Sequence, residues 1–272
     1  MEKSLTTLLS FIFMISLYSQ NESIDPKPKG MVFVPQGSYD MTNSARVAVD
    51  AFWMSNEITN AEYREFVEWT KSNPDKKLYQ NKYSVEVFND PKKGVTKDTV
   101  IVKTIPIEVS TFIADMIDPL SLEKTNKNFI NYFTDKKYDD YPVVGISFKM
   151  AQYYCLWKTM IENDQLKEKG LPPVQSYRIP LESEWEYVAQ QPVSMKDKEE
   201  LIQPVNTGNC NDWDLFHLND NVSEWVSHRE GITGIIRGGS WKSGNSIAER
   251  QVINPDSQEP FVGLRIVRSY VP

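Results

Sequence analysis

The sequence predicts an α+β fold made of one irregular domain with a long insertion. Three stretches have the capping residues or the apolar spacing of a helix: EITNAEYREFVEW, SFKMAQYYCLWKTMIEN and LESEWEYVAQ. The last third of the chain has no long helical periodicity and contains short aromatic strands separated by Gly, Asn and Asp. No internal repeat or low-complexity tract is present in the 272 residues, which suffice for one sizeable core.

The composition is that of a folded chain without an evident charged partner. The chain is 40% hydrophobic and 25% charged, which excludes a disordered protein. A formal net charge of −7 indicates neither a nucleic-acid-binding surface nor a patch for anionic membranes. We therefore attribute the mild acidity to solubility and expect no nucleic-acid partner.

Residues 1–19 have the layout of a secretory signal peptide. The apolar run SLTTLLSFIFMISLYS is too short for a membrane span and is followed by polar residues. We predict cleavage after Ser19 and a linker over residues 20–30. No cysteine lies near this junction. We therefore expect a periplasmic or secreted protein that has no lipid anchor and no membrane span once the signal is removed.

The chain has two cysteines, Cys155 and Cys210, and two histidines, His217 and His228. Export permits a disulfide, but two cysteines far apart in sequence do not establish one. A Cys155–Cys210 disulfide and two free buried thiols therefore remain alternatives. Two histidines are too few for a histidine-rich zinc or iron site.

The N-terminal part is predicted to contain strands and one capped helix. MVFVPQGSYDM indicates a strand that ends at a Pro-Gln-Gly turn. In the next block, a strand precedes a helix for which Thr59 is the N-cap and Glu62 completes a capping box. The pair Asn73-Pro74 is expected to end this helix.

Residues 71–140 are predicted to form an insertion without a chemical motif. Lysines and acids are mixed along it, and VIVKTIPIEV indicates one strand whose proline should keep it at a sheet edge. Insertions on a fixed scaffold often carry partner specificity.

The next two blocks predict two further helices. YPVVGIS is expected to be a buried strand, and Ser147 is expected to cap the helix that follows. The core face of that helix is predicted to contain Met150, Ala151, Tyr154, Cys155, Trp157 and Ile161. In LESEWEYVAQ, Trp185, Val188 and Ala189 share one helical face. The carboxylates in that helix, Glu182, Glu184 and Glu186, are predicted to lie in a solvated first turn.

Seven blocks occur in an order that resembles one family: MVFVPQGSYDM, EITNAEYREFVEW, YPVVGISFKMAQYYCLW, RIPLESEWEYVA, DLFHLNDNVSEW, RGGSW and VGLRIV. Together they resemble the formylglycine-generating-enzyme, or sulfatase-modifying-factor, domain over residues 29–268. The resemblance implies a duplicated, irregular α+β fold similar to C-type lectins. We assign that domain to residues 31–268, with the insertion at residues 71–140.

The resemblance also implies a site whose reactive residues are replaced. Aerobic enzymes of the family oxidise a substrate cysteine with two copper-binding cysteines, which follow the serine of RGGS by three and eight positions. Ser243 and Ala248 stand at those positions here. Copper(I) binding and thiol exchange both need a thiolate, which neither residue supplies. We therefore predict a pseudoenzyme with no catalytic residues.

The motif itself is then expected to be structural. Two glycines allow backbone conformations that other residues resist, and an arginine can bridge carbonyls or a carboxylate. The predicted structural turn consists of Arg237, Gly238, Gly239, Ser240 and Trp241.

The family's calcium sites give one further expectation. The resemblance places two backbone carbonyls at Asp220 and Val222 and a carboxylate at Glu224, so calcium is the cofactor that it implies. We favour the alternative interpretation, in which no cofactor is bound, because His217 stands where the family has a ligating asparagine and is a poor ligand for a cation that prefers oxygen. In this interpretation Glu224 caps local backbone donors and Trp225 packs in the core.

The insertion and its flanking blocks are most similar to the gliding-motility lipoproteins GldK and GldJ, which work with type IX secretion. The leading hypothesis is a non-catalytic, exported structural or binding component of a cell-envelope assembly. Its partners would be envelope or secretion-machinery proteins. The alternatives are a divergent formylglycine-generating oxidase that acts on protein cysteine and a secreted carbohydrate- or ligand-binding module.

Overall fold

The computed structural model describes residues 26–40, 46–90, 95–194, 202–208, 210–228, 234–244 and 249–272. Nothing is described for the side chains of residues 83–90, 95–100 and 194. The predicted signal peptide, most of the predicted linker and Ala248 lie outside the described residues.

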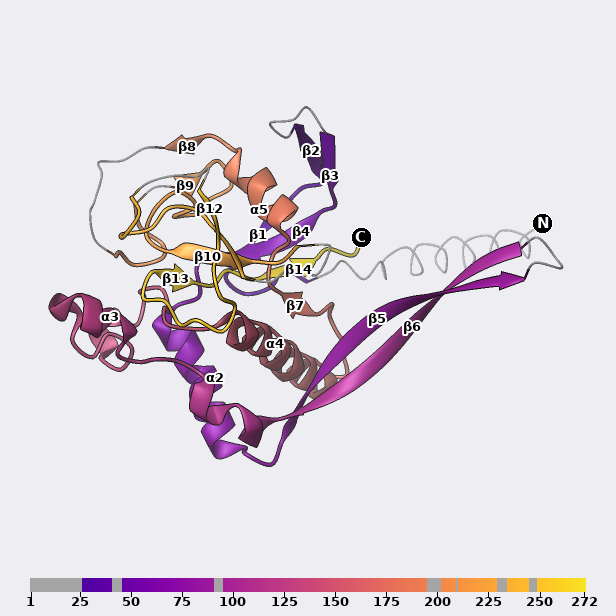
Figure 1. The fold of residues 1–272 in the computed structure, drawn as a ribbon, viewed down its shortest axis with the longest axis horizontal. Helices are drawn as coiled ribbons and strands as arrows, with labels where there is room; N and C mark the ends of the chain where they lie inside the picture. The colour runs from indigo at the N-terminus through magenta and orange to yellow at the C-terminus, as the bar shows by residue number, and fades with distance from the viewer. Residues whose placement is uncertain are drawn as a thin grey trace, which may run out of the picture.

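Two four-stranded sheets form the centre of the molecule (Figure 1). The first sheet has the order β1-β4-β14-β7 and is antiparallel throughout. The second has the order β12-β11-β10-β13, in which only β13 runs parallel to its neighbour. Their strands are β1 (Met31–Val34), β4 (Phe52–Ser55), β7 (Tyr177–Arg178), β10 (Ser223–Val226), β11 (Ile235–Arg237), β12 (Arg250–Val252), β13 (Val262–Gly263) and β14 (Val267–Ser269).

The remaining elements surround these sheets and confirm the α+β class. The helices are α2 (Asn60–Ser72), α3 (Ser121–Thr125), α4 (Phe148–Glu168) and α5 (Glu182–Ala189), with short 3-10 turns η1 (Val109–Thr111), η2 (Ile113–Asp115), η3 (Lys127–Phe129) and η4 (Lys136–Tyr138). The strands outside the two sheets are β2 (Gly37–Asp40), β3 (Arg46–Val49), β5 (Lys77–Asp90), β6 (Val95–Glu108), β8 (Val193–Ser194) and β9 (Cys210–Asn211).

Both predicted N-caps are confirmed. The Thr59 hydroxyl accepts a hydrogen bond from the Glu62 backbone N (3.1 Å), and the Glu62 carboxylate accepts one from the Thr59 backbone N (3.0 Å). Asn73 is the C-cap of α2, as predicted. The Ser147 hydroxyl accepts a hydrogen bond from the Met150 backbone N and begins α4.

The strand predicted before α4 is wrong, although its burial is right. Val143, Val144 and Ile146 are buried, but the backbone forms only one isolated bridge, between Pro142 and Thr59. The neighbouring N–H groups donate to scattered carbonyls: Val143 to Ile58 (2.8 Å) and Gly145 to Glu259 (3.1 Å). A positive φ of 76° at Gly145 also interrupts an extended strand.

Aromatic packing between α2 and α4 forms the centre of the largest core cluster. The rings of Tyr63 and Tyr154 stack with centroids 5.6 Å apart, and Phe66 lies 5.4 Å from Trp157. The predicted core face of α4 is confirmed except at Ile161, which is only partly buried. The predicted core face of α5 is also buried.

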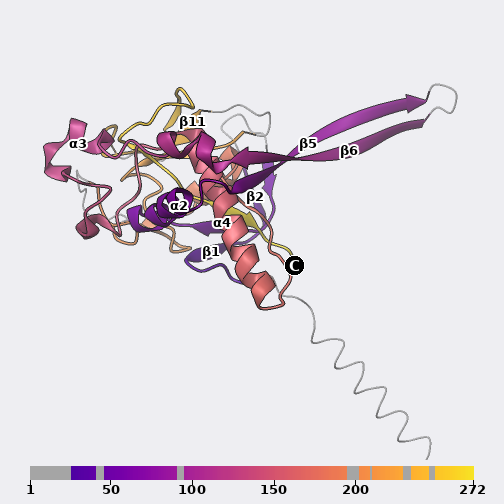
Figure 2. The ribbon, with the colours of Figure 1, turned by 90° about the horizontal axis from the view of Figure 1, so that it is seen from below.

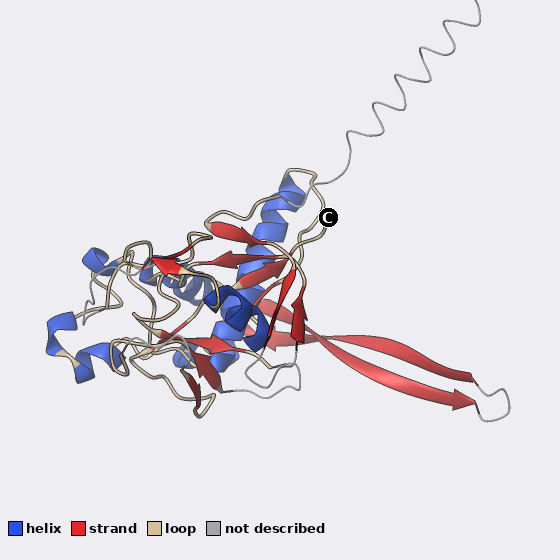
Figure 3. Ribbon diagram, turned by 90° about the horizontal axis from the view of Figure 1, so that it is seen from above, coloured by secondary structure: helices blue, strands red, loops and turns tan. Residues whose placement is uncertain are grey.

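A long β-hairpin projects from this body (Figures 2 and 3). We call the paired strands β5 and β6 the arm. The ladder runs from the Lys77–Glu108 pair at the body to the Asp90–Val95 pair at the far end. The sequence predicted one strand here, so the prediction was incomplete. Pro106 does lie at an edge, because the two strands of the arm pair only with each other among the described strands.

Leu78 anchors the base of the arm in the core and is fully buried. The side chains of Tyr79 and Val102 are 59% and 52% exposed. In the described part of the chain, no helix has the length and apolar character needed to cross a membrane.

Candidate functional site

The RGGSW motif forms a tight turn immediately after β11. Gly238 has a φ of 82°, and a Cβ atom there would lie 2.8 Å from the Leu218 carbonyl oxygen. No other residue fits that conformation and that contact without displacing the backbone. The turn closes where the Ser240 N–H donates to the Gly244 carbonyl (3.2 Å) and the Gly244 N–H donates back to Ser240 (2.8 Å).

Two hydroxyl groups meet within this turn. The Oγ atoms of Ser240 and Ser243 lie 3.0 Å apart, and the Ser243 backbone N–H donates to Ser240 Oγ (3.2 Å). Ser243 is exposed, so the position is accessible. Its hydroxyl can donate or accept a proton in a hydrogen bond but is a poor ligand for a soft metal. Ala248, the other position implied by the resemblance, lies outside the described residues.

Neither cysteine stands at one of the two positions that the resemblance implies. Cys155 lies within α4 in the largest core cluster, and Cys210 lies in β9 on the other side of the body (Figure 1). Both are free thiols, so the disulfide alternative is wrong; of the two, only Cys155 is fully buried. Burial raises the pKa of Cys155 to about 12, which keeps this thiol protonated at neutral pH.

Arginine side chains hold the motif against α5. The Arg237 Nη2 donates to Glu186 Oε1 (2.7 Å), and its guanidinium lies 5.3 Å from the centre of the Trp185 ring. Arg250 from β12 donates to Glu182 (2.6 Å). Arg237, the arginine of the motif, thus contacts a carboxylate and an aromatic face, as its predicted structural role requires.

The solvated first turn predicted for α5 is wrong. Glu182 and Glu184 are buried, and Arg178 from β7 binds Glu184 with two hydrogen bonds of 2.6 Å. The sequence interpretation considered only the helix dipole. Each of these carboxylates is instead paired with an arginine from a strand: Glu184 with Arg178, six positions before it, and Glu182 with Arg250, 68 positions after it.

Glu224, the carboxylate of the implied calcium site, is bound by side chains. Its Oε1 accepts a hydrogen bond from Arg265 Nη2 (2.7 Å), and its Oε2 accepts one from Trp185 Nε1 (2.7 Å). Glu224 and Arg265 are 1% and 0% exposed. A calcium ion coordinated by Glu224 would therefore lie next to the buried guanidinium of Arg265, which binds the same carboxylate.

The other members of the implied site also lie in the interior. Val222 belongs to a core cluster, and Asp220 Oδ1 lies 2.7 Å from His217 Nδ1. Among the described residues, no group of three or more His, Cys, Asp and Glu side chains is placed to hold a metal ion. Trp225 packs in the core and donates to the Ile146 carbonyl (3.0 Å), as the alternative interpretation expected. The partners found for Glu224 are side chains, which that interpretation did not expect.

A buried polar cluster beside Glu224 was not predicted from the sequence. Asn221, with a φ of 62°, donates from Nδ2 to Glu57 Oε2 (2.6 Å) and accepts from the Gln203 N–H (2.9 Å). Glu57 Oε1 is buried and has no hydrogen-bond partner. Burial raises the pKa of Glu57 to about 8, and the charge of the neighbouring His217 acts in the opposite direction.

His217 lies beside Glu57, and its pKa is also shifted. Burial, the largest single effect, lowers the pKa of His217. The hydrogen bond to Asp220 and the charge of Glu57 outweigh burial, and the net pKa is raised. The only sequence signal for this cluster was its pattern of polar residues between apolar ones, which does not identify partners 160 or more positions apart in the chain.

The comparison with family models now gives the identity of the domain. The model described as the sulfatase-modifying factor enzyme 1-like domain matches residues 18–193 and 190–270. The chain belongs to this family. Membership agrees with the α+β fold and with the structural turn at RGGSW.

Two solved structures are similar to this member of the family. A protein described as "Crystal Structure of CarF" is 16% identical with a TM-score of 0.55, over 90% of this chain and 100% of that chain. At this identity the likeness shows the fold alone. The Treponema denticola variable protein 1 is 14% identical with a TM-score of 0.48, over 88% of this chain and 94% of that one. No curated protein matches the chain.

Proposed function

We propose that the chain is a non-catalytic, exported binding component of a cell-envelope assembly. The arm is the observation that carries this proposal. At about 3.3 Å per residue, its 14-residue strands extend roughly 45 Å, well beyond what the body of the domain needs for its own core. The partner would be an envelope or secretion-machinery protein.

The geometry of the arm favours a role in recognition. An isolated two-stranded ribbon is only marginally stable in water, and its outer edges offer unpaired backbone groups to another strand. Tyr79 and Val102 add exposed apolar surface at the described part of the arm. These features suit a partner that binds by adding a strand and covering apolar side chains.

The RGGSW turn supports the non-catalytic part of the proposal. Ser243 supplies a hydroxyl hydrogen-bonded to Ser240 where the family's oxidation needs a thiolate. Cys155 is buried, and its raised pKa opposes thiolate formation. A divergent oxidase would therefore need chemistry other than that of the family's cysteine pair.

An association with type IX secretion or gliding motility is the more specific form of the proposal. It is supported by the similarity of the insertion and its flanking blocks to GldK and GldJ. The proposed location is the periplasm or the cell exterior, reached through the signal peptide predicted at residues 1–19. An envelope fractionation with immunodetection tests this location, and a purely cytoplasmic signal would contradict it.

A shortened arm tests the proposal directly. In the variant, residues 80–105 are replaced by Asn-Gly, so that the facing residues Tyr79 and Pro106 flank a two-residue hairpin turn. Leu78 stays in the core, so the thermal unfolding midpoint should change little. Crosslinking and affinity purification from the native envelope should recover a partner with the full chain and lose it with the shortened arm.

A further inference from the structure

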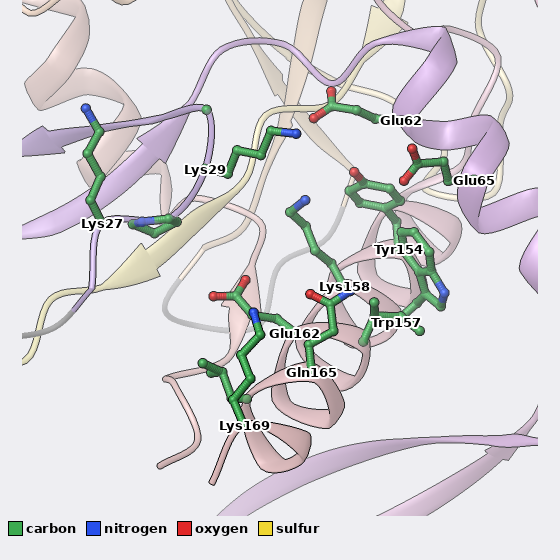
Figure 4. Close-up of a pocket in the computed structure, with 14 residues that line it drawn as sticks. Lys27, Lys29, Glu62, Glu65, Tyr154, Trp157, Lys158, Glu162, Gln165 and Lys169 are labelled. Atoms are coloured by element: carbon green, nitrogen blue, oxygen red, sulfur yellow. The ribbon is translucent and has the colours of Figure 1, made fainter. Parts of the chain in front are cut away.

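A cavity of about 520 Å³ lies between α2, α4 and the segment that precedes β1 (Figure 4). Its volume falls within the range of small-molecule sites. The cavity lies on the helical side of the molecule, and none of its lining residues belongs to the RGGSW turn, the buried Glu57 cluster or the arm. The cavity is therefore separate from the motif, the polar cluster and the arm, although Glu62 in its wall also caps α2 and Tyr154 also packs against Tyr63.

Two of the acidic groups in this wall already have partners. Glu62 accepts hydrogen bonds from the backbone N and the hydroxyl of Thr59 at the start of α2. Glu162 accepts from Arg268 Nη1 (3.1 Å) and from the Tyr177 hydroxyl. Glu65 is the acidic side chain of the wall that remains exposed, and it forms no hydrogen bond or ion pair with a residue that the structure describes.

The cationic groups of the wall are not neutralised. Four lysines line the cavity, and none of them forms an ion pair with a described residue: Lys27, Lys29, Lys158 and Lys169. Because Arg268 pairs with Glu162, the four lysines outnumber the two other carboxylates of the wall, Glu62 and Glu65, and the local charge is positive, although the chain as a whole carries −7. The net negative charge of the whole chain does not attract an anion from a distance. The local excess of lysines instead favours an anion that binds at short range, inside the cavity.

A buried hydroxyl adds a second, independent feature. Tyr154 is 0% exposed, and its Oη atom has no hydrogen-bond partner. Figure 4 shows this hydroxyl pointing toward the end of the cavity that the ammonium groups of Lys29 and Lys158 also approach. An unpaired buried hydroxyl is costly, so a ligand atom that accepts its hydrogen bond would gain affinity.

We propose that this cavity binds a small polyanion. Lys29 and Lys158 would hold one anionic group near the Tyr154 hydroxyl, which donates a hydrogen bond to it. Lys27 and Lys169 line the cavity further from that hydroxyl (Figure 4), which suits a ligand with a second anionic group. The shared chemistry is two or more carboxylates or phosphates on a compact molecule.

The test is calorimetric titration of the full chain with citrate and, separately, with tripolyphosphate at physiological ionic strength. The two probes distinguish carboxylate from phosphate recognition. The variant Lys29→Gln/Lys158→Gln should weaken binding by about tenfold or more, because contacts to charged groups are lost. The matched control is Lys82→Gln/Lys103→Gln, which removes the same charge from two exposed lysines that face each other on the arm.

Two single variants separate a built site from general charge attraction. Tyr154→Phe keeps the ring and should weaken binding several-fold, with folding checked by circular dichroism. Glu65→Gln removes the exposed opposing carboxylate and should strengthen binding. Failure of both probes to bind the full chain would overturn the proposal, and so would an equal loss in the arm control.

Discussion

Arg265 illustrates how a single residue connects distant parts of this fold. Its guanidinium donates to Glu224, to the Ser55 carbonyl (2.8 Å) and to the Phe216 carbonyl (2.7 Å). These partners come from β10, β4 and the loop before β10, and the side chain is fully buried. Removal of Arg265 would leave the buried Glu224 carboxylate without its counter-charge and two backbone carbonyls without this donor.

Arg265→Leu should therefore lower the free energy of unfolding by about 3–5 kcal/mol, measured by urea denaturation. The matched control is Arg250→Leu, whose side chain is 41% exposed while it pairs with Glu182. Because solvent screens that pair, its loss should cost about 1 kcal/mol or less. Equal effects of the two substitutions would contradict the assigned role of Arg265.

Glu57 predicts an unusual pH dependence. Its pKa is raised to about 8 in the folded protein, above the ordinary value of 4.5. The folded state therefore binds more protons than the unfolded state between these values, and stability falls as pH rises through that window. The raised pKa of His217 acts in the same direction, because its stabilising charge is lost as pH rises above its folded pKa.

Glu57→Gln keeps an acceptor for Asn221 and removes the titration. Chemical denaturation at intervals from pH 5 to pH 8 should show a flatter stability profile than the original chain. Glu68→Gln, which changes a carboxylate with a side chain 67% exposed, should leave the profile unchanged. Identical slopes for Glu57→Gln and the original chain would refute the assigned titration.

The absence of the family's oxidation is also a residue-scale prediction. With copper and oxygen present, incubation with a peptide containing the CxPxR pattern should give no formylglycine, as read by mass spectrometry. The reason is that Ser243 carries a hydroxyl in place of a thiolate. An aldehyde product that is abolished by Ser243→Ala would show that the turn is catalytic.

At the scale of elements, the sequence predicted the features that depend on residues close together in the chain. The caps of α2 and α4 involve residues three positions apart, so Thr59, Glu62 and Ser147 were identified correctly. The pairing of Glu186 and Glu182 was not predictable in this way, because their partners Arg237 and Arg250 are more than fifty residues distant from them. The same holds for Glu57, whose partner is Asn221.

Strands were harder to predict for a related reason. The segment before α4 is apolar because it is buried, but its N–H groups bind carbonyls from separate loops, which no local pattern encodes. The first strand of the arm alternates apolar and polar residues only over the short run YSVEV at residues 83–87 and is polar over QNK before it. So short a run does not indicate a strand of 14 residues or its pairing with β6.

The cap of α2 provides a direct test at this scale. Thr59→Ala removes the hydroxyl that accepts the Glu62 N–H and should lower the free energy of unfolding by about 1 kcal/mol. Thr59→Ser keeps the hydroxyl and should retain most of the stability in the same urea titration. A loss for Thr59→Ser as large as that for Thr59→Ala would assign the effect to the lost methyl group instead.

At the scale of the whole molecule, the chain closes on itself while the arm extends outward. β14 pairs with β4, so the last strand completes a sheet begun near the start of the described chain. The arm lies between α2 and α4 in the sequence and projects away from this closed body (Figure 2). The domain family could be identified from seven sequence blocks, whereas the shape of its insertion could not, because the blocks describe only the shared scaffold.

The most direct measurement is the amount of envelope protein that co-purifies with the full chain, divided by the amount recovered with the shortened arm. The assembly role predicts a specific partner with the full chain and loss of that partner with the shortened arm, at an unchanged thermal midpoint. Equal recovery with both chains, or recovery of free monomer alone, would contradict it.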